Sequence, residues 1–349
     1  MANRESGIEL LRGILMLMIV LVHLTGNGVL KSEAPISYTE SNWILANIID
    51  ALAYPAVNTF VIISGYFGIR LSLLRVLKLD IPVIIYSVAL YLLFETATIG
   101  GTIWFSFPIL TNEYWFLTAY FLLMLISPFL NAYIETKNQH QLFLLLFWSV
   151  LLMVIVPSFS PLCLSDPRGM DVINFGVLYI VGRSIAQIKI SISIKKSLFI
   201  YTLSSLTAFS LTLVFAYYLG INRGWQSHFY SYNNILVFSQ AIALFFIFKQ
   251  VIICERLGRY INWLAPSFFF VYIIHSHPSV HKQLYYWISS SDFYFSDLFF
   301  LHTIGWGVII FSICIIIDIT IRRWLLNSFI NATINSFMKV YDDISSKFF

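Results

Sequence analysis

Residues 8–23 of this 349-residue chain read IELLRGILMLMIVLVH, an apolar run whose only charged residues are Glu9 and Arg12 and whose last residue is His23. A run of this length predicts a membrane-spanning helix. Charged and titratable groups are costly inside a bilayer and usually mark function there. Eleven residues of α-helix make about three full turns, so Arg12 and His23 face the same way, roughly 16 Å apart. Glu9 precedes Arg12 by three residues and is in reach of it.

The composition of the whole chain indicates an integral membrane protein. Hydrophobic residues make up 59% of it and charged residues 11%, and the mean hydropathy is +0.81; soluble domains carry about 25% charged residues. The net charge of +4 comes with no basic run, so no nucleic-acid partner is expected. Cys163, Cys254 and Cys314 show neither metal nor disulfide spacing and are interpreted as free thiols.

Apolar segments of about spanning length recur along the chain, and they predict an all-α polytopic protein with about ten transmembrane helices. The expected spans are Ile8–Leu24, Trp43–Phe67, Val76–Phe94, Tyr114–Ile134, Leu142–Val156, Val172–Ile188, Leu198–Leu219, Ile235–Ile253, Phe268–Ile288 and Leu298–Ile321. The charges in the first span argue against a cleaved signal peptide, so it is expected to remain as a helix.

The distribution of basic residues predicts the orientation. If the N-terminus is cytoplasmic, all but four of the 21 Lys and Arg residues fall at or near the inner face, the exceptions being Lys31, Arg168, Arg223 and Lys282. This bias is the one that cytoplasmic loops show. Both termini are therefore predicted to be cytoplasmic. Residues 1–325 are expected to form one membrane domain, and residues 326–349 a short cytoplasmic tail with amphipathic character.

A basic turn follows the second span. Ser64-Gly65 is succeeded by Arg70, Arg75 and Lys78, and the last two share a helix face at three-residue spacing. One interpretation is ordinary positive-inside charge. The other is a site for an anionic, phosphate-bearing ligand that approaches from the cytoplasm.

The outer half carries a second group of candidates. Glu113 and Trp115 open the fourth span, where aromatics serve either as interfacial anchors or as a sugar-binding mouth. Tyr272 and His275 lie on one face of the ninth span at a depth comparable to that of His23. Asp50, in the outer part of the second span, is placed to face His23 and orient it.

Plainer interpretations exist for several of these residues. Arg12 alone suits a snorkelling anchor, and His23 suits a buried polar residue that a neighbouring helix satisfies. Asp318 has Arg322 four residues later, which indicates a local ion pair. His277 and His281 have zinc-ligand spacing but lack an evident third ligand, so no metal is expected.

Taken in order, these motifs resemble the integral-membrane acyltransferase-3 family, many of whose members O-acetylate bacterial surface polysaccharides. The stretches that carry the resemblance are Arg12-x10-His23 after an acidic residue, Phe60-x3-Ser64-Gly65-Tyr66, the basic turn before Pro82, Trp115-Phe-Leu, Gly182-Arg183 and Tyr272-x2-His275. They extend from Glu9 to about His275. The basic turn departs from the common pattern, since it reads Arg75-Val-Leu-Lys78 with Asp80 before the proline, where members often have two arginines.

The resemblance implies a multi-pass enzyme of the bacterial cytoplasmic membrane that takes acetyl from cytoplasmic acetyl-CoA and passes it to a hydroxyl on the far side. It gives the acyl-transfer role to Arg12 and His23. The expected partners are acyl-CoA, a glycan or lipid-linked glycan acceptor, and membrane lipids.

Together with the patterns above, the resemblance leads to a set of expected roles. The catalytic group is His23, Glu9 and Asp50; the donor-binding group is Arg12, Arg70, Arg75 and Lys78; the acceptor-binding group is Glu113, Trp115, Tyr272 and His275. His23 either deprotonates the acceptor hydroxyl or carries the acetyl group as a nucleophile.

The alternative function is a proton-coupled transporter or flippase of a lipid-linked sugar, with His23, Asp50 and His275 as a proton relay. Transporters often show internal repeats, and the sequence shows none. A third reading, a membrane receptor or regulator without chemistry, leaves the basic turn and the aligned histidine unexplained. The acceptor glycan, the acyl group and the oligomeric state are not readable from the sequence.

Overall fold

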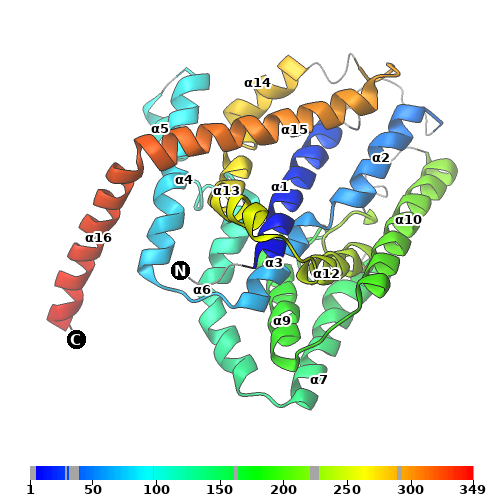
Figure 1. Ribbon diagram of the computed structural model, residues 1–349, viewed down its shortest axis with the longest axis horizontal. Helices are drawn as coiled ribbons and strands as arrows, with labels where there is room; N and C mark the ends of the chain where they lie inside the picture. Colours follow the sequence, from blue (N-terminus) through cyan, green and yellow to red (C-terminus); the bar gives the residue numbers. More distant parts are fainter. Residues whose placement is uncertain are drawn as a thin grey trace.

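The computed structural model describes residues 5–27, 30, 39–96, 98–160, 164–220, 228–288 and 293–348. These residues contain helices and no strand (Figure 1). The helices are α1 Ser6–Asn27, α2 Ser41–Ala53, α3 Ala56–Phe67, α4 Leu73–Phe94, α5 Ile99–Phe105, α6 Trp115–Glu135, α7 Gln139–Val150, α8 Val156–Phe159, α9 Val172–Ile188, α10 Ile194–Leu219, α12 Ile235–Lys249, α13 Glu255–His275, α14 Pro278–Ile288, α15 Phe299–Asp318 and α16 Asn327–Phe348, with π-helical turns η2 Leu151–Ile155 and η3 Ile319–Leu325. Lys31, Cys163 and Arg223 lie outside the described ranges.

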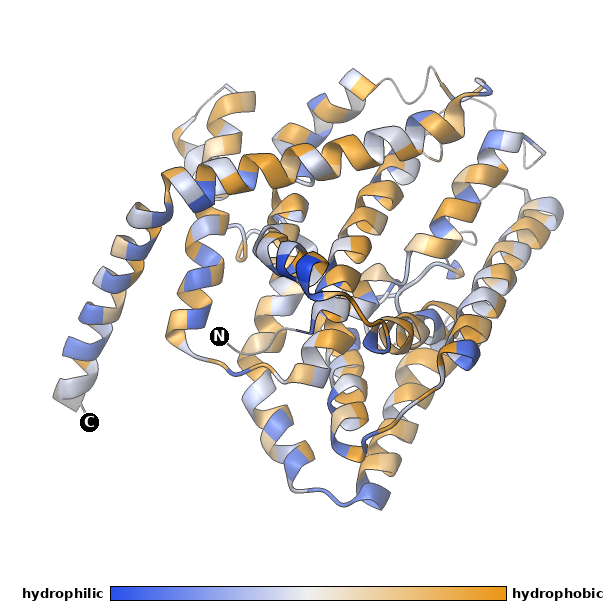
Figure 2. Ribbon diagram, in the orientation of Figure 1, coloured by the Kyte–Doolittle hydropathy of each residue, from blue (hydrophilic) through white to orange (hydrophobic). Residues whose placement is uncertain are grey.

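Seven helical segments of the described chain are long and apolar enough to cross a membrane. They are Ser6–Asn27, Ser41–Phe67, Leu73–Phe94, Trp115–Glu135, Gln139–Phe159, Ile194–Leu219 and Phe299–Leu325, and α9 and α12 are shorter apolar helices. Figure 2 shows that hydrophobic residues dominate the bundle, most continuously along α15. The chain is therefore an all-helical membrane protein, and the count of ten spans and the side of each terminus stay predictions.

Two predicted spans have different boundaries in the structure. The ninth, Phe268–Ile288, is wrong as a single helix: α13 ends at His275 and α14 begins at Pro278. Proline favours the first position of a helix and disfavours helical conformation in the residue before it. The second predicted span is divided at Tyr54-Pro55 into α2 and α3.

Capping side chains explain where several helices begin. Ser72 accepts a hydrogen bond from the backbone N–H of Arg75 at the start of α4. Asn138, Asp171 and Asn234 cap α7, α9 and α12 in the same way. Each cap satisfies one of the free N–H groups of a first turn.

The predicted tail forms α16, a helix of 22 residues that projects away from the bundle (Figure 1). Its inner face packs on α4, where Ile330 and Ile334 contact Ile81. Figure 2 shows hydrophilic residues recurring along it, in contrast to α15. The amphipathic character expected of the tail is thus present, in a helix held against α4.

Helix α1 lies at the centre of the bundle and packs against α2, α3, α12, α13 and α15. Ile8, Leu11, Leu15 and Ile19 recur at three- or four-residue spacing and are buried in the main core. Such spacing gives a helix one continuous apolar stripe. The stripe fixes the rotation of α1 and so decides which neighbours its polar residues meet.

Helices α3 and α9 cross closely because each contributes a glycine. A Cβ added to Gly65 would lie 2.3 Å from the carbonyl oxygen of Tyr179, and one added to Gly182 would lie 2.2 Å from that of Ile62. Small residues permit this approach of two helix backbones within a membrane. Gly182, part of the Gly182-Arg183 motif, therefore has a packing role.

Gly182→Ala is expected to destabilise the protein by about 1–3 kcal/mol, because the added methyl group must push two backbones apart. Thermal denaturation of the detergent-solubilised variant would measure the loss. Gly176→Ala, on the same helix but with open space around its Cβ position, is the control and should be neutral or slightly stabilising. Equal melting temperatures for the two variants would contradict the close crossing.

Candidate functional site

A cavity of about 270 Å³ lies against one face of α1. Its lining on α1 includes Arg12, Met16, Ile19 and His23, which repeat at three- or four-residue spacing along one face. The other walls come from the α2–α3 break, α6 and α13. Arg12 and His23 therefore line one cavity, as their eleven-residue spacing predicts. We call it the central cavity.

A second hollow, of about 330 Å³, adjoins the central cavity at the Arg12 end. Arg12, Ser64, Leu79 and Tyr120 line both hollows. The second hollow also has Arg70 and Arg75 in its wall, and Arg75 Nη1 donates to the carbonyl oxygen of Arg70 over 2.8 Å. We call it the basic mouth. Lys78, which the sequence grouped with these arginines, is exposed on α4 and lines neither hollow.

Glu9 pairs with Arg12 and not with the histidine. Arg12 Nη1 lies 2.6 Å from Glu9 Oε1, and the Glu9 residue is only 6% exposed. His23 is fourteen residues further along α1, about 21 Å away. Glu9 thus holds Arg12 at the junction of the two hollows, the contact that its three-residue spacing predicts. Its expected place in the catalytic group stays a prediction.

At the other end of the central cavity, His23 contacts a second histidine. His23 Nδ1 lies 2.9 Å from His275 Nε2, and the ring centroids are 5.1 Å apart. His275 Nδ1 in turn lies 2.6 Å from the carbonyl oxygen of Val271, four residues earlier on α13. His275 is 1% exposed. The pair joins α1 to the end of α13.

The hydrogen-bond network assigns the proton positions of this pair as neutral imidazoles. A carbonyl oxygen only accepts, so His275 Nδ1 carries the hydrogen that is donated to Val271. His275 Nε2 is then an acceptor, and His23 Nδ1 must be the donor to it. The lone pair of His23 is left on Nε2, which receives no hydrogen bond from any residue that the structure describes. This is the arrangement that a general base requires.

Ser276 completes this group and was not anticipated. Its Oγ lies 3.3 Å from His23 Nδ1 and 3.2 Å from His275 Nε2. Ser276 directly follows the Tyr272-x2-His275 motif, so the sequence could have indicated that it lies near the site. The bend of the chain after α13, which brings its hydroxyl to His23, could not be predicted. The carbonyl of Val271 has no sequence signal at all, because any residue supplies one.

Asp50 is not placed against His23. Its Oδ1 accepts a hydrogen bond of 2.5 Å from Thr25 Oγ1, and the residue is 3% exposed. The expected orienting contact is therefore made by His275 instead. The reason is that α2 meets a different face of α1: Thr25 follows His23 by two residues and so lies about 160° around the helix from it.

Two of the four expected acceptor-binding residues line the central cavity, and two, Glu113 and His275, do not. Trp115 and Tyr272 are in its wall, and the Trp115 ring stacks on Tyr232 with centroids 5.4 Å apart. Glu113 instead accepts a hydrogen bond of 3.1 Å from Trp104 Nε1, between α5 and α6. Burial raises the pKa of the Glu113 carboxyl group.

Further aromatic residues in the cavity wall were missed by the sequence interpretation. Tyr54, Tyr232 and Tyr120 contribute, and Tyr120 Oη lies 3.2 Å from Ser64 Oγ. In a chain with 17% aromatic residues, nothing distinguishes these three from aromatics that face lipid. Among the residues described, no three His, Cys, Asp or Glu side chains gather closely enough to hold a metal ion.

A family model described as an acyltransferase domain matches residues 5–322. Comparisons with curated proteins and with solved structures give no match. The family match includes every residue of the central cavity and of the basic mouth.

Proposed function

The chain belongs to the acyltransferase-3 family, and on that premise we propose that it moves an acetyl group from cytoplasmic acetyl-CoA to a hydroxyl of an extracytoplasmic or lipid-linked glycan. The membrane would be the cytoplasmic membrane of a bacterium. One observation carries the proposal: the basic mouth adjoins the central cavity, and that cavity is lined by His23, whose Nδ1 is bonded to His275 and whose Nε2 takes no hydrogen bond from a described residue. Donor binding and proton abstraction would then occur at opposite ends of one space.

The basic mouth suits the phosphates of coenzyme A. Guanidinium groups bind phosphate oxygens through paired, charge-assisted hydrogen bonds, and Arg12, Arg70 and Arg75 converge on this hollow. The pantetheine arm would enter the central cavity along α1 and span most of the roughly 16 Å between Arg12 and His23. Lys78 would add positive charge near the mouth without lining it.

The proposed reaction uses His23 as a general base. His23 Nε2 takes the proton of the acceptor hydroxyl while the hydroxyl oxygen attacks the thioester carbonyl carbon. The imidazolium that forms still donates its Nδ1 hydrogen to His275 Nε2 and Ser276 Oγ. In a Ser-His-Asp triad the aspartate stabilises the imidazolium through the same ring nitrogen. The C–S bond then breaks, and the coenzyme A thiolate takes the proton from Nε2.

A covalent route uses the same lone pair. His23 Nε2 would attack the thioester first, and the acetyl group would pass to the acceptor in a second step. The two routes differ in a single-turnover experiment without acceptor, since only the covalent route releases one equivalent of coenzyme A per protein.

The acceptor would meet the aromatic part of the cavity. Trp115, Tyr232, Tyr54 and Tyr272 all line the cavity. The Tyr272 ring centroid lies 6.3 Å from that of His275, and the Trp115 and Tyr54 centroids lie 5.4 Å and 6.1 Å from that of Tyr232. Their flat apolar faces and polar edges suit a sugar ring. This lining favours a glycan hydroxyl over a small apolar alcohol.

The proposal is tested with the purified protein in lipid nanodiscs, supplied with radiolabelled acetyl-CoA and a glycan extract of the source membrane. Transfer of label to alkali-labile ester on the glycan supports it. Movement of a lipid-linked sugar across the bilayer without consumption of acetyl-CoA would instead establish the transporter alternative.

Arg12→Ala and Arg75→Ala are each expected to weaken coenzyme A binding roughly 10- to 100-fold. Each removes a charge-assisted contact of about 1.5–3 kcal/mol. Titration of coenzyme A into the solubilised variants would measure the change. Arg259→Ala, an exposed arginine at the start of α13 that lines neither hollow, is the matched control. Unchanged affinity in both test variants would move the donor site elsewhere.

A further inference from the structure

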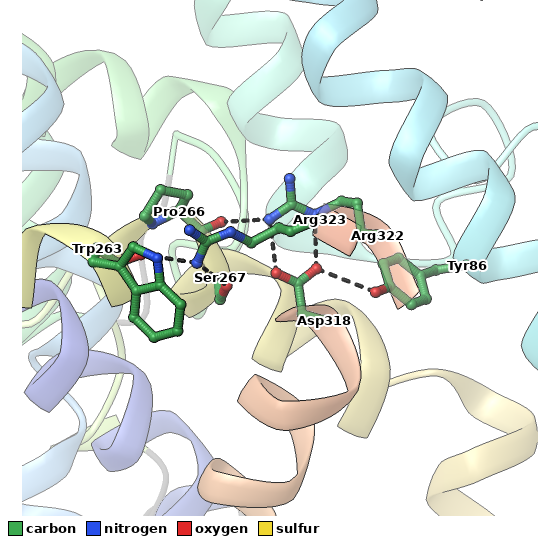
Figure 3. Close-up of polar contacts among 7 residues, drawn as sticks. All are labelled: Tyr86, Trp263, Pro266, Ser267, Asp318, Arg322 and Arg323. Atoms are coloured by element: carbon green, nitrogen blue, oxygen red, sulfur yellow. Dashed lines mark hydrogen bonds and ion pairs between the residues drawn. The ribbon is translucent and has the colours of Figure 1, made fainter. Parts of the chain in front are cut away.

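An ion pair lies behind the α13 wall of the central cavity, where α15 passes into η3 (Figure 3). The Asp318 side chain is fully buried, and Arg322 binds it through two hydrogen bonds of 2.7 Å, from Nε to Oδ1 and from Nη2 to Oδ2. Tyr86 of α4 donates to the same Oδ1 over 3.1 Å. The local ion pair predicted from the four-residue spacing is confirmed, and it joins two helices.

The arginines extend the contact to a third helix, α13. Arg322 Nη2 donates to the carbonyl oxygen of Pro266 over 3.1 Å, and Arg323 Nη1 donates to that of Trp263 over 2.8 Å. The two guanidinium groups also lie over the Phe270 and Trp263 rings, at 4.1 Å and 4.8 Å from their centroids. Figure 3 shows both arginines directed at this part of α13, with the Asp318 carboxylate directed at Arg322 and Tyr86.

Local backbone geometry makes the double contact possible. Each carbonyl oxygen has two lone pairs, so those of Trp263 and Pro266 can accept from an arginine as well as from their own helix. The segment Ile319–Leu325 is π-helical, a rare conformation that is frequent at functional sites. In it, two consecutive arginines reach the same neighbouring helix.

The contacted face of α13 is opposite to the face that lines the central cavity. Ala265, Phe269 and Tyr272 repeat at four- and three-residue spacing and line the cavity. Trp263 and Phe270, which the arginines cover, are about 140–160° around the helix from Ala265. Both faces belong to one continuous helix, so a rotation or shift imposed on one face also moves the other.

The end of this helix carries His275, which fixes the proton on His23. We propose that Asp318, Arg322 and Arg323 form a positioning clamp that sets the rotation and depth of α13, and thereby holds His275 Nε2 against His23 Nδ1. The inference rests on the proposed function for its kinetic consequence. A buried ion pair is a weak source of stability and a costly one in a membrane segment, which fits a positioning role.

The test compares Arg322→Lys and Asp318→Asn with Glu135→Gln. Arg322→Lys keeps the charge and loses the two-pronged contact, so it remains informative where Asp318→Asn fails to fold. Glu135→Gln removes a different Arg–carboxylate pair, Arg183–Glu135, whose Glu135 side chain is 59% exposed.

For the clamp variants we expect kcat to fall about 30- to 100-fold, because small misplacements of catalytic groups cause losses of this size. KM for acetyl-CoA should stay within about threefold, because Arg12, Arg70 and Arg75 lie on other segments. The control should match the unmutated protein in both constants.

Hydrogen–deuterium exchange supplies a readout that does not depend on activity. Backbone amides of residues 262–275 should exchange faster in Arg322→Lys, while those of α3 and α9 stay unchanged. Wild-type kcat together with unchanged exchange in α13 would overturn the clamp and leave the proposed function intact. A different outcome is that the unmutated protein transfers no acetyl group while Arg322→Lys still exchanges faster in α13. That outcome would support the clamp and contradict the proposed function.

Discussion

His23→Ala is expected to reduce acetyl transfer about 10²- to 10⁴-fold without loss of the folded protein. A well-placed general base contributes about 10²–10⁴-fold to a rate, and the route through a covalent intermediate would lose its nucleophile entirely. The side chain lines the central cavity and is bonded to His275 and Ser276, but it is not part of the helix crossing at Gly65 and Gly182. The measurement is the initial rate of label transfer from acetyl-CoA at equal amounts of purified protein.

The control for this variant is His140→Ala. His140 is exposed on α7 and lines neither the central cavity nor the basic mouth, so its removal should leave the rate unchanged. Coenzyme A binding to His23→Ala should also stay close to normal, since the phosphates would contact Arg12, Arg70 and Arg75. A variant that binds coenzyme A normally and retains a near wild-type rate would show that another group performs the chemistry.

His275→Leu is expected to lower kcat by about two to three orders of magnitude. The change removes the acceptor that holds the hydrogen of His23 on Nδ1, so His23 loses its fixed proton position and the support of its imidazolium form. Removal of the group that orients a catalytic histidine has effects of this order or larger in hydrolases. Steady-state kinetics with acetyl-CoA would show the fall in kcat, with little change in KM for the donor.

His275→Gln separates this role from a contact with substrate or from packing. The Gln amide oxygen accepts a hydrogen bond, so this variant should recover a substantial part of the activity lost in His275→Leu. If His275 served only to bind the acceptor, both variants would raise KM for the glycan and leave kcat similar. Equal loss of kcat in the Leu and Gln variants would contradict the assigned proton positions.

The sequence predicted the parts of this site that depend on helix periodicity. Arg12 and His23 share a face because their spacing is close to a whole number of turns, and Asp318 reaches Arg322 for the same reason. The family match then confirmed the resemblance that the ordered motifs had indicated. Side chains on one helix are readable in this way because their relative positions are set locally.

Contacts between helices were less readable. The expected partner of His23 was Asp50, yet α2 meets a different face of α1. The helices are also broken at Tyr54-Pro55 and at Ser276-His277. Both breaks fall next to prolines, which signalled a possible interruption without giving its angle. Val271, Ser276 and the contact of Arg323 with Trp263 depend on backbone geometry and three-dimensional packing that no residue pattern records.

Sealed membrane vesicles test the central claim most directly. Radiolabelled acetyl-CoA is added to the outside of inverted vesicles, whose exposed face is the cytoplasmic one, and to the outside of right-side-out vesicles, each prepared with the unmutated protein and with His23→Ala. The account predicts labelled glycan ester only in inverted vesicles with the unmutated protein. Labelling from right-side-out vesicles, or equal labelling with His23→Ala, would contradict transfer from a cytoplasmic donor through His23.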